Sequence, residues 1–439
     1  MYRATLLIGV LALPFGAGAT EPASVPGELL VRFRADADIA RIGALHARTG
    51  SQVLEVIEEL NLYRVKIPAT RSLQDVAATY AADPGCAYAE PNYLGRGGDF
   101  VPNDSFLPNQ WHLNNTGQSS GLPDADIDAI EGWSITRGSP DITVAVLDTG
   151  IDFSHTEFQG RTLAGFDFVN SDSDPTADHR HGSQVSGLLA ANADNAFGIA
   201  GVDHAAKILP VKVLDANNLG STANLIQGLV FAAQQGADVI NMSLIGFPPF
   251  SLALSDALQF ARDAGSILIA CAGNNGIGDA DVSGPGASPL TLSVGWTTRQ
   301  DTRALSSATG NALDLVAPGE DLVSIFLSPT IDGGFPFSGC SAATPLVSGI
   351  VSLMLSLDPS LDHDQVRAIL IATAEDQVGP PSEDAPGWDP FLGHGRVNMD
   401  AALRVLAPPP VPLAPSWLLA LFGVLLLRTG ARRLRSARA

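Results

Sequence analysis

Four polar side chains that could do chemistry together stand in short runs of small residues. Ser341 opens an apolar, helix-like segment, and Asp148 ends an apolar, strand-like run. His181 precedes small and apolar residues with helical character, and Asn274 follows a second strand-like run. A hydroxyl, an imidazole and a carboxylate make an activated nucleophile, and an amide N–H can stabilise an oxyanion. The four residues therefore predict acyl-transfer chemistry, provided that the fold brings them together.

Each of the four also has a simpler explanation when it is taken alone. A serine at such a junction is more often the N-cap of a buried helix than a nucleophile. Asp148 and Asn274 are then turn residues, and His181 is a surface histidine. Pro345 supports a helix that begins near Ser341, because proline is tolerated in a first helical turn. The N-terminus of such a helix favours developing negative charge.

Apolar and helix-like segments alternate between residues 141 and 407. The strand-like runs are residues 142–147, 206–214, 237–242 and 266–272, and the helix-like segments include 222–235 and 252–264. Nearly continuous apolar strands are typical of parallel sheets that are buried on both faces. The pattern predicts an α/β domain with a parallel central sheet, whose ligand site lies at the carboxyl ends of the strands.

A smaller unit precedes this domain. Residues 28–93 show strand and helix periodicities in the order β-α-β-β-α-β, which predicts a small α+β, ferredoxin-like unit. Residues 95–104 contain glycines and a proline and predict an exposed linker that is open to proteolytic cutting.

The composition excludes some functions and favours others. The formal net charge of -21 argues against nucleic acid as a partner, because nucleic-acid binding needs a basic face. An acidic chain suits a soluble exported protein, and its carboxylates can also hold Ca²⁺. Cys86, Cys271 and Cys340 are too few for a disulfide framework, and we expect three buried thiols.

Both ends of the chain differ from the predicted domains. Residues 1–19 have the basic start, apolar centre and small-residue end of a secretory signal. Residues 407–412 form a stiff proline spacer, and the apolar residues 417–427 are followed by a cluster of arginines. This end predicts a single membrane segment with a basic cytoplasmic flank.

Taken together, the motifs resemble those of the subtilisin-like serine proteases, the subtilase family. The matching stretches are residues 146–150 (VLDTG), 181–183 (HGS), 272–274 (AGN) and 339–345 (GCSAATP), with further matches at 317–319 and 393–398. They occur in the family's order, and the resemblance runs from about residue 104 to residue 406. It implies a subtilisin-like three-layer domain and a triad in the chain order Asp, His, Ser.

The resemblance implies a role for each of the four residues. Ser341 attacks the scissile carbonyl, His181 takes its proton and returns it to the leaving amine, and Asp148 holds the imidazole. Asn274, together with the N–H of Ser341, stabilises the oxyanion. The family also binds protein or peptide substrates by strand addition. The residues implied for this are Gly220, Ser221, Ser243, Leu244, Ile245 and Gly246.

The chain departs from the family's usual pattern close to the nucleophile. Cys340 stands in place of threonine, Ala342 in place of methionine, and Ile245 in place of a glycine of the substrate-binding loop. The first change removes a hydroxyl that could assist the oxyanion site, and the last should narrow the first substrate pocket. We therefore expect a slower or more selective enzyme than a digestive relative. The alternatives are a catalytically silent surface binding module and an esterase.

Calcium is the structural ion that the resemblance implies, because residues 192–199 (NADNAFGI) resemble the family's calcium loop. The implied ligands are the side chains of Asp104, Glu157 and Asn195 and the carbonyl oxygens of Ala193, Phe197 and Ile199. Residues 167–174, which include Asp167 and Asp172, resemble a second and weaker site. A solvated acidic loop is the alternative there.

The resemblance also assigns the outer segments. Residues 28–93 look like the inhibitory prodomain of subtilases, which assists folding and occupies the active site until the chain is cut between Tyr93 and Asp104. The tail, with VPLAP at residues 411–415, resembles the PEP-CTERM sorting signals of Gram-negative bacteria. That likeness implies a sorting transpeptidase as a partner, with a simple membrane anchor as the alternative.

The sequence thus predicts an exported precursor destined for the cell envelope or the medium. The expected divisions are a signal peptide (1–19), a prodomain with its linker (20–100), a catalytic domain (101–407) and a tail with spacer, membrane or sorting helix and basic end (408–439).

Overall fold

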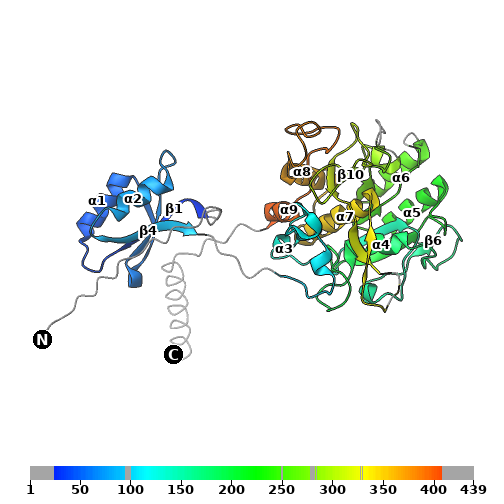
Figure 1. Ribbon diagram of the computed structural model, residues 1–439, viewed down its shortest axis with the longest axis horizontal. Coiled ribbons are helices and arrows are strands. Elements are labelled where there is room, and N and C mark those ends of the chain that lie inside the picture. Colours follow the sequence, from blue (N-terminus) through cyan, green and yellow to red (C-terminus); the bar gives the residue numbers. More distant parts are fainter. Residues whose placement is uncertain are drawn as a thin grey trace, which may run out of the picture. The chain divides into compact units, whose positions relative to one another are not determined.

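The chain divides into two compact units, residues 1–97 and 98–439 (Figure 1). The computed structural model describes residues 24–93, 100–248, 251–276, 282, 284–326, 328 and 330–407. The expected signal peptide, the C-terminal tail and residues 94–99 of the linker region lie outside the described residues.

The first unit is a four-stranded antiparallel sheet with two helices. Its sheet has the order β2-β3-β1-β4, and Asp38 and Ser72 each accept a backbone hydrogen bond at the start of a helix. The elements are β1 (Ser24–Phe33), α1 (Ile39–Thr49), β2 (Gln52–Ile57), the 3-10 turn Glu58–Leu60, β3 (Leu62–Lys66), α2 (Leu73–Ala81) and β4 (Cys86–Tyr93). The predicted order β-α-β-β-α-β is confirmed.

A parallel seven-stranded sheet forms the centre of the second unit. Its order is β11-β10-β9-β8-β5-β7-β6, and each pair of neighbours is parallel. The strands are β5 (Thr143–Asp148), β6 (Phe166–Asp167), β7 (Lys207–Lys212), β8 (Val239–Met242), β9 (Ile267–Cys271), β10 (Leu292–Thr297) and β11 (Leu315–Pro318). A separate antiparallel pair consists of β12 (Leu322–Ile325) and β13 (Gly334–Phe337).

Helices cover both faces of this sheet. They are α3 (Ala129–Gly132), α4 (His181–Ala190), α5 (Thr222–Gln234), α6 (Leu252–Asp263), α7 (Cys340–Leu357), α8 (His363–Thr373) and α9 (Met399–Leu406), with 3-10 turns at Leu107–Asn109, Gln118–Ser120, Thr156–Phe158 and Gly284–Ala287. Val144 and Val146 of β5 share a core with α4 and α7, whereas Ala145 and Leu147 share another core with α5 and α6. Because successive strand residues face opposite sides, the unit has three layers, and the predicted fold class is confirmed.

The helix α7 runs through the core of the second unit (Figure 1). Within the described part of the chain it is the one helix long and apolar enough to cross a membrane, and 89% of it is buried inside the unit. Its apolar character is therefore explained by packing against the sheet. Pro345 lies near its start, where proline is tolerated.

The sheet brings three separate loops to one edge. Asp148 ends β5, Ser243 follows β8, and Asn274 lies three residues beyond β9. These strands are neighbours in the order β9-β8-β5, and the carboxyl ends of parallel strands meet at the same edge. The candidate site is built at that edge.

Candidate active site

Asp148 and His181 meet at the carboxyl edge of the sheet. Asp148 is fully buried at the end of β5, and His181 is the first residue of α4. The Nδ1 atom of His181 lies 2.8 Å from Oδ1 and 2.9 Å from Oδ2 of Asp148. Burial lowers the pKa of the His181 imidazole, but the charge and hydrogen bond of Asp148 outweigh burial and raise this pKa above its ordinary value. This contact leaves Nε2 as the nitrogen that can act as a base.

Thr149 links the turn after Asp148 to the start of α4. Its hydroxyl accepts a hydrogen bond from the N–H of Gly182 and donates one to the carbonyl oxygen of His179, both at 2.9 Å. Gly182 lies so close to this turn that an added Cβ would be 2.2 Å from the carbonyl oxygen of Gly150. A glycine is therefore needed directly after the histidine.

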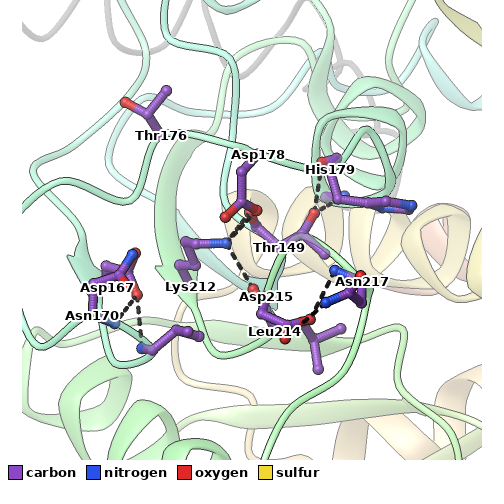
Figure 2. A network of polar contacts seen from close by, with 12 residues as sticks. Thr149, Asp167, Asn170, Thr176, Asp178, His179, Lys212, Leu214, Asp215 and Asn217 are labelled. Atoms are coloured by element: carbon purple, nitrogen blue, oxygen red, sulfur yellow. Dashed lines mark hydrogen bonds and ion pairs between the residues drawn. The ribbon is translucent and has the colours of Figure 1, made fainter.

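A buried lysine, which sequence reasoning did not single out, ties together the loops around the two residues. Lys212 ends β7, pairs in register with Asp148, and is 1% exposed. Figure 2 shows its Nζ donating to the carbonyl oxygens of Thr149 (3.1 Å) and Leu214 (2.8 Å) and to Oδ1 of Asp178 (2.6 Å). All three ammonium donors are used. Lys212 thus joins the turn after β5, the segment after β7 and the loop before α4.

Ser341 is the second residue of α7. It lines the same pocket as His181 and Asn274, and the volume of this pocket is about 490 Å³. Its hydroxyl donates to the carbonyl oxygen of Ser243 at 3.2 Å, and the hydroxyl of Ser243 donates to the carbonyl oxygen of Ser341 at 3.2 Å. The fold therefore brings the predicted chemical groups together, with Asp148 behind His181. Proton transfer to His181 requires the Ser341 hydroxyl to turn from Ser243 towards Nε2.

Asn274 is held at the N-terminus of α7. Its Oδ1 accepts a hydrogen bond from the N–H of Cys340 at 2.9 Å, which leaves its Nδ2 group as a donor. Gly339 has φ 110°, and an added Cβ there would lie 3.0 Å from Asn274 Oδ1. The N–H of Ser341 lies in the first helical turn and has no acceptor within the helix. Two donors are thus available at this end of α7.

Cys271 and Cys340 form a disulfide, and the expectation of three buried thiols is wrong for this pair. Cys271 ends β9 and Cys340 begins α7, and both are fully buried. Their Cα atoms lie 5.2 Å apart across a sequence separation of 69 residues, which is within the usual range of Cα separations for a disulfide. Counting cysteines did not reveal the pairing, because only the fold brings these two elements together. Cys86 of the first unit is a buried free cysteine.

Most of the predicted substrate-binding residues line the pocket. These are Gly220, Ser243, Leu244, Ile245 and Gly246. Ser221 instead caps α5, because its side chain accepts a hydrogen bond from the N–H of Asn224 at 3.1 Å. Thr222 and Phe247 also line the pocket and were not predicted. Each directly follows a predicted segment in the sequence, which is the signal that could have found them.

Two of the predicted calcium ligands, Asp104 and Glu157, are buried carboxylates that face the loop of residues 192–199. Glu157 accepts hydrogen bonds from the N–H of Ile199 (3.0 Å) and from Nδ2 of Asn195 (3.1 Å). Asp104 accepts one from the N–H of Asp194 (2.8 Å), while its Oδ1 is buried with no hydrogen-bond partner among the described residues. Burial raises the pKa of Glu157 to about 8, and the charge of Asp104 also raises it. An orphaned oxygen beside a second buried carboxylate fits a hard cation.

The predicted second calcium site is differently arranged. The carboxylate of Asp167 accepts hydrogen bonds from the N–H of Val169 (2.7 Å) and from the N–H (3.0 Å) and Nδ2 (2.9 Å) of Asn170 (Figure 2). Asp172 accepts one from the N–H of Asp174 at 2.9 Å. Among the residues that the structure describes, no three His, Cys, Asp or Glu side chains are grouped to hold a metal. Both sites therefore depend on backbone or amide oxygens and stay predictions.

Comparison with known proteins gives family matches for both units. The model described as the subtilase family matches residues 139–395, and the model described as the fervidolysin N-terminal prodomain matches residues 17–92. A thermophilic serine proteinase from Bacillus sp. (strain AK1) is 31% identical over 383 residues, covering 86% of this chain and 87% of that protein.

Two further likenesses extend the comparison. A cell wall-associated protease from Bacillus subtilis (strain 168) is 32% identical over 375 residues, covering 78% of this chain and 41% of that protein. A solved structure of proteases from Pseudoalteromonas arctica PAMC 21717 has a TM-score of 0.62 and 27% identity, covering 70% of this chain and 100% of that chain.

Proposed function

The chain belongs to the subtilase family and is a serine-type endopeptidase, and we propose that Ser341, His181 and Asp148 form its catalytic triad. Two observations support this. His181 Nδ1 lies 2.8 Å from Oδ1 of Asp148, and His181 lines the same pocket as Ser341. Ser341 Oγ attacks the scissile carbonyl carbon while Nε2 of His181 takes its proton. The imidazolium then gives this proton to the leaving amine, and water repeats the sequence on the acyl-enzyme.

Asp148 acts through His181. Its contact with Nδ1 fixes the tautomer in which Nε2 is the base, and its charge stabilises the imidazolium once the proton has arrived. The complete burial of Asp148 strengthens this interaction, because no water screens it.

Asn274 and the backbone N–H of Ser341 are the proposed donors to the tetrahedral oxyanion. The hydrogen bond from the N–H of Cys340 to Asn274 Oδ1 supports this role, because it orients the amide and leaves Nδ2 for the intermediate. Removing such a donor costs about 100- to 1000-fold in turnover, a magnitude that comes from a member of this family.

The substrate is proposed to be an extended peptide that adds as a strand between the segments after β7 and β8. Gly220 and Gly246 line the pocket, and an added Cβ at Gly220 would lie 2.3 Å from the carbonyl oxygen of Val213. Main-chain pairing supplies the affinity, and the side-chain pockets supply the selectivity. The exposed side chain of Ile245 narrows the pocket that receives the residue before the scissile bond.

The first unit is a prodomain of the fervidolysin type, consistent with synthesis as a zymogen. We propose that it occupies the active site of the second unit and is released after a cut between Tyr93 and Asp104. Export through the signal at residues 1–19 is also proposed, and it agrees with the cell wall-associated protease of Bacillus subtilis among the relatives. The proposed fate of the tail is sorting through, or anchoring to, a Gram-negative cell envelope, with a sorting transpeptidase as the partner.

Calcium is the proposed structural ion. Asp104, Glu157 and Asn195 would hold it with the carbonyl oxygens of Ala193, Phe197 and Ile199. When bound, it would neutralise the two buried carboxylates and hold the loop of residues 192–199 against the segment at Asp104, whose neighbour Phe106 already donates to the carbonyl oxygen of Gly198 at 2.8 Å.

A fluorophosphonate probe tests the triad directly. It should label the wild-type protein at Ser341, fail on Ser341→Ala, and label His181→Ala at a greatly reduced rate. A peptide library should be cleaved by the wild-type protein and not by Ser341→Ala. Equal labelling of the wild type and His181→Ala would contradict the proposed base.

Purified precursor of Ser341→Ala tests the processing step. It should remain uncut between Tyr93 and Asp104 under conditions in which the wild-type precursor is cut. Cleavage of the variant in pure form would show that another protease does the processing.

A further inference from the structure

We propose that the Cys271–Cys340 disulfide positions the two groups that form and hold the tetrahedral intermediate, the nucleophile Ser341 and the oxyanion donor Asn274. The inference rests on the roles proposed above for these two residues. The two cysteines are therefore positioning residues, which act through their neighbours and do not touch the substrate.

The bridge joins the two elements that carry these groups at the points nearest to the chemistry. Cys271 is the last residue of β9, and Asn274 follows three positions later. Cys340 is the first residue of α7, and Ser341 follows directly. With Cα atoms 5.2 Å apart, the bridge makes a covalent path of only a few residues between donor and nucleophile.

A hydrogen bond closes this path into a small ring. The N–H of Cys340 donates to Oδ1 of Asn274 at 2.9 Å, so the same two segments are joined once by the disulfide and once by the amide. The direction of the Asn274 amide therefore depends on where Cys340 lies. A shift of Cys340 would turn Nδ2 away from the oxyanion position and move the N–H of Ser341 with it.

The backbone between these points needs such a restraint. Gly273 (φ 141°) precedes Asn274, and Gly339 (φ 110°) precedes Cys340. Glycine has no side chain that limits the backbone, so packing alone restrains the segments before Asn274 and Cys340 only weakly. The disulfide holds the chain directly after Gly339 and two residues before Gly273, and the hydrogen bond from Cys340 to Asn274 holds the chain directly after Gly273. Because both cysteines are fully buried, the bridge is part of the core and stays closed in the folded enzyme.

Forming the bridge needs an oxidant. The Cys271 and Cys340 thiols together lose two protons and two electrons, and a disulfide of an oxidising exchange partner takes these up and becomes a dithiol. Such partners act in extracytoplasmic compartments, which agrees with the proposed export. The bond therefore forms where the enzyme is meant to work.

Thiol counting tests the bond itself. The uncut Ser341→Ala precursor, denatured without reductant, should show one reactive thiol, that of Cys86, and three after reduction. The Cys86→Ala variant should show none before reduction. Three thiols before reduction in protein recovered from an oxidising compartment would overturn the proposal.

Kinetics of the Cys271→Ala/Cys340→Ala double variant test the positioning. We expect kcat for a peptide substrate to fall about 10- to 100-fold, with KM changed by less than about twofold, because a misplaced reacting group lowers kcat rather than binding. Affinity for a peptidyl boronate, whose adduct is tetrahedral, should fall with kcat. Affinity for a peptide product should stay as in the wild type, because a product does not form the tetrahedral adduct.

The matched control is Met354→Ala, a fully buried residue of α7 far along the helix from Ser341. It should lower the melting temperature while leaving kcat and KM as in the wild type. A wild-type kcat in the double variant, or the same loss of kcat in Met354→Ala, would overturn the inference.

Reduction of the wild-type enzyme covers the case in which the double variant does not fold. The full chain, unfolded and then refolded with a phosphine reductant present, should keep two more thiols than the chain refolded without reductant, and its kcat should be lower. Two new thiols without loss of kcat would overturn the inference alone. Failure of the proposed function is distinct, because Ser341→Ala would then keep its activity.

Discussion

His181 reaches both carboxylate oxygens of Asp148 with a single ring nitrogen, at 2.8 and 2.9 Å. Asp148 is fully buried, so its charge acts on the imidazole through protein rather than through water. The pair also fixes which nitrogen of His181 faces the pocket. Both consequences can be measured through the pH dependence of the reaction.

The first prediction concerns the acid limb of kcat/KM. The imidazole must be neutral to take a proton from Ser341, and its pKa is raised above the ordinary 6.5. Activity should therefore be lost, as the pH falls, with a midpoint above 6.5 in the free enzyme. Asp148→Asn should move this midpoint down and lower kcat by about 10⁴-fold. A stopped assay on one peptide substrate across the pH range measures both effects.

The neighbouring His179 supplies the control. Its ring centroid lies 6.5 Å from that of His181, and its Nδ1 accepts a hydrogen bond from the backbone N–H of His181 at 3.2 Å, not from the His181 ring. His179→Gln should leave the acid limb in place. If the midpoint of the acid limb shifts in His179→Gln, or does not shift in Asp148→Asn, the assignment of His181 is contradicted.

The second prediction concerns selectivity at Ile245. This side chain lines the pocket and is 41% exposed. Ile245→Gly should open the space for the residue before the scissile bond. The ratio of kcat/KM for a peptide with phenylalanine at that position to kcat/KM for the same peptide with alanine should then rise about tenfold. Competition between the two peptides in one reaction measures this ratio. Leu122→Gly, another exposed apolar residue, should leave the ratio unchanged, and an equal shift in both variants would refute the pocket assignment.

The third prediction concerns calcium. A chelator should lower the melting temperature by several degrees, because binding at 100-fold above Kd is worth about 2.7 kcal/mol. Glu157→Gln should abolish this response, since it removes a buried carboxylate from the proposed ligand set. Asp256→Asn, which changes an exposed carboxylate on α6, should keep the response. Identical calcium responses in all three proteins would refute the site.

The sequence was sufficient for features in which local pattern and fold agree. The apolar run of β5 ends in Asp148, and such a run is typical of a buried parallel strand, whose polar end faces the functional edge of the sheet. The periodicity of the first unit likewise predicted its order of elements. The sequence alone could not show the Cys271–Cys340 bridge, because cysteines 69 residues apart carry no local sign of pairing.

Lys212 was missed for a related reason. A lysine between two valines looks like the outward-facing residue of an alternating strand. In the folded chain its Nζ donates to the carbonyl oxygen of Thr149, which is 63 residues away in the sequence, so its burial is visible only in three dimensions. Ser221 shows the opposite error. It lies in the segment implied for substrate binding, but the start of α5 uses its hydroxyl as a cap.

The fourth prediction follows from Lys212. Lys212→Met keeps an unbranched apolar stem but removes all three hydrogen bonds of Nζ, two of them to the carbonyl oxygens of Thr149 and Leu214. Stranding buried acceptors should cost about 1–3 kcal/mol in the free energy of unfolding, measured by urea denaturation of the processed protein. Lys207→Met, at the other end of β7, should change it by less than about 0.5 kcal/mol.

Asp178→Asn separates the ion pair from the carbonyl contacts of Lys212. The Asp178 side chain is 43% exposed, so the loss of its charge should cost no more than about 1 kcal/mol. If Lys212 acts mainly by joining these loops, Lys212→Met should be clearly more destabilising than Asp178→Asn. Equal effects would mean that the ion pair, and not the joining of the loops around Asp148 and His181, accounts for the buried lysine.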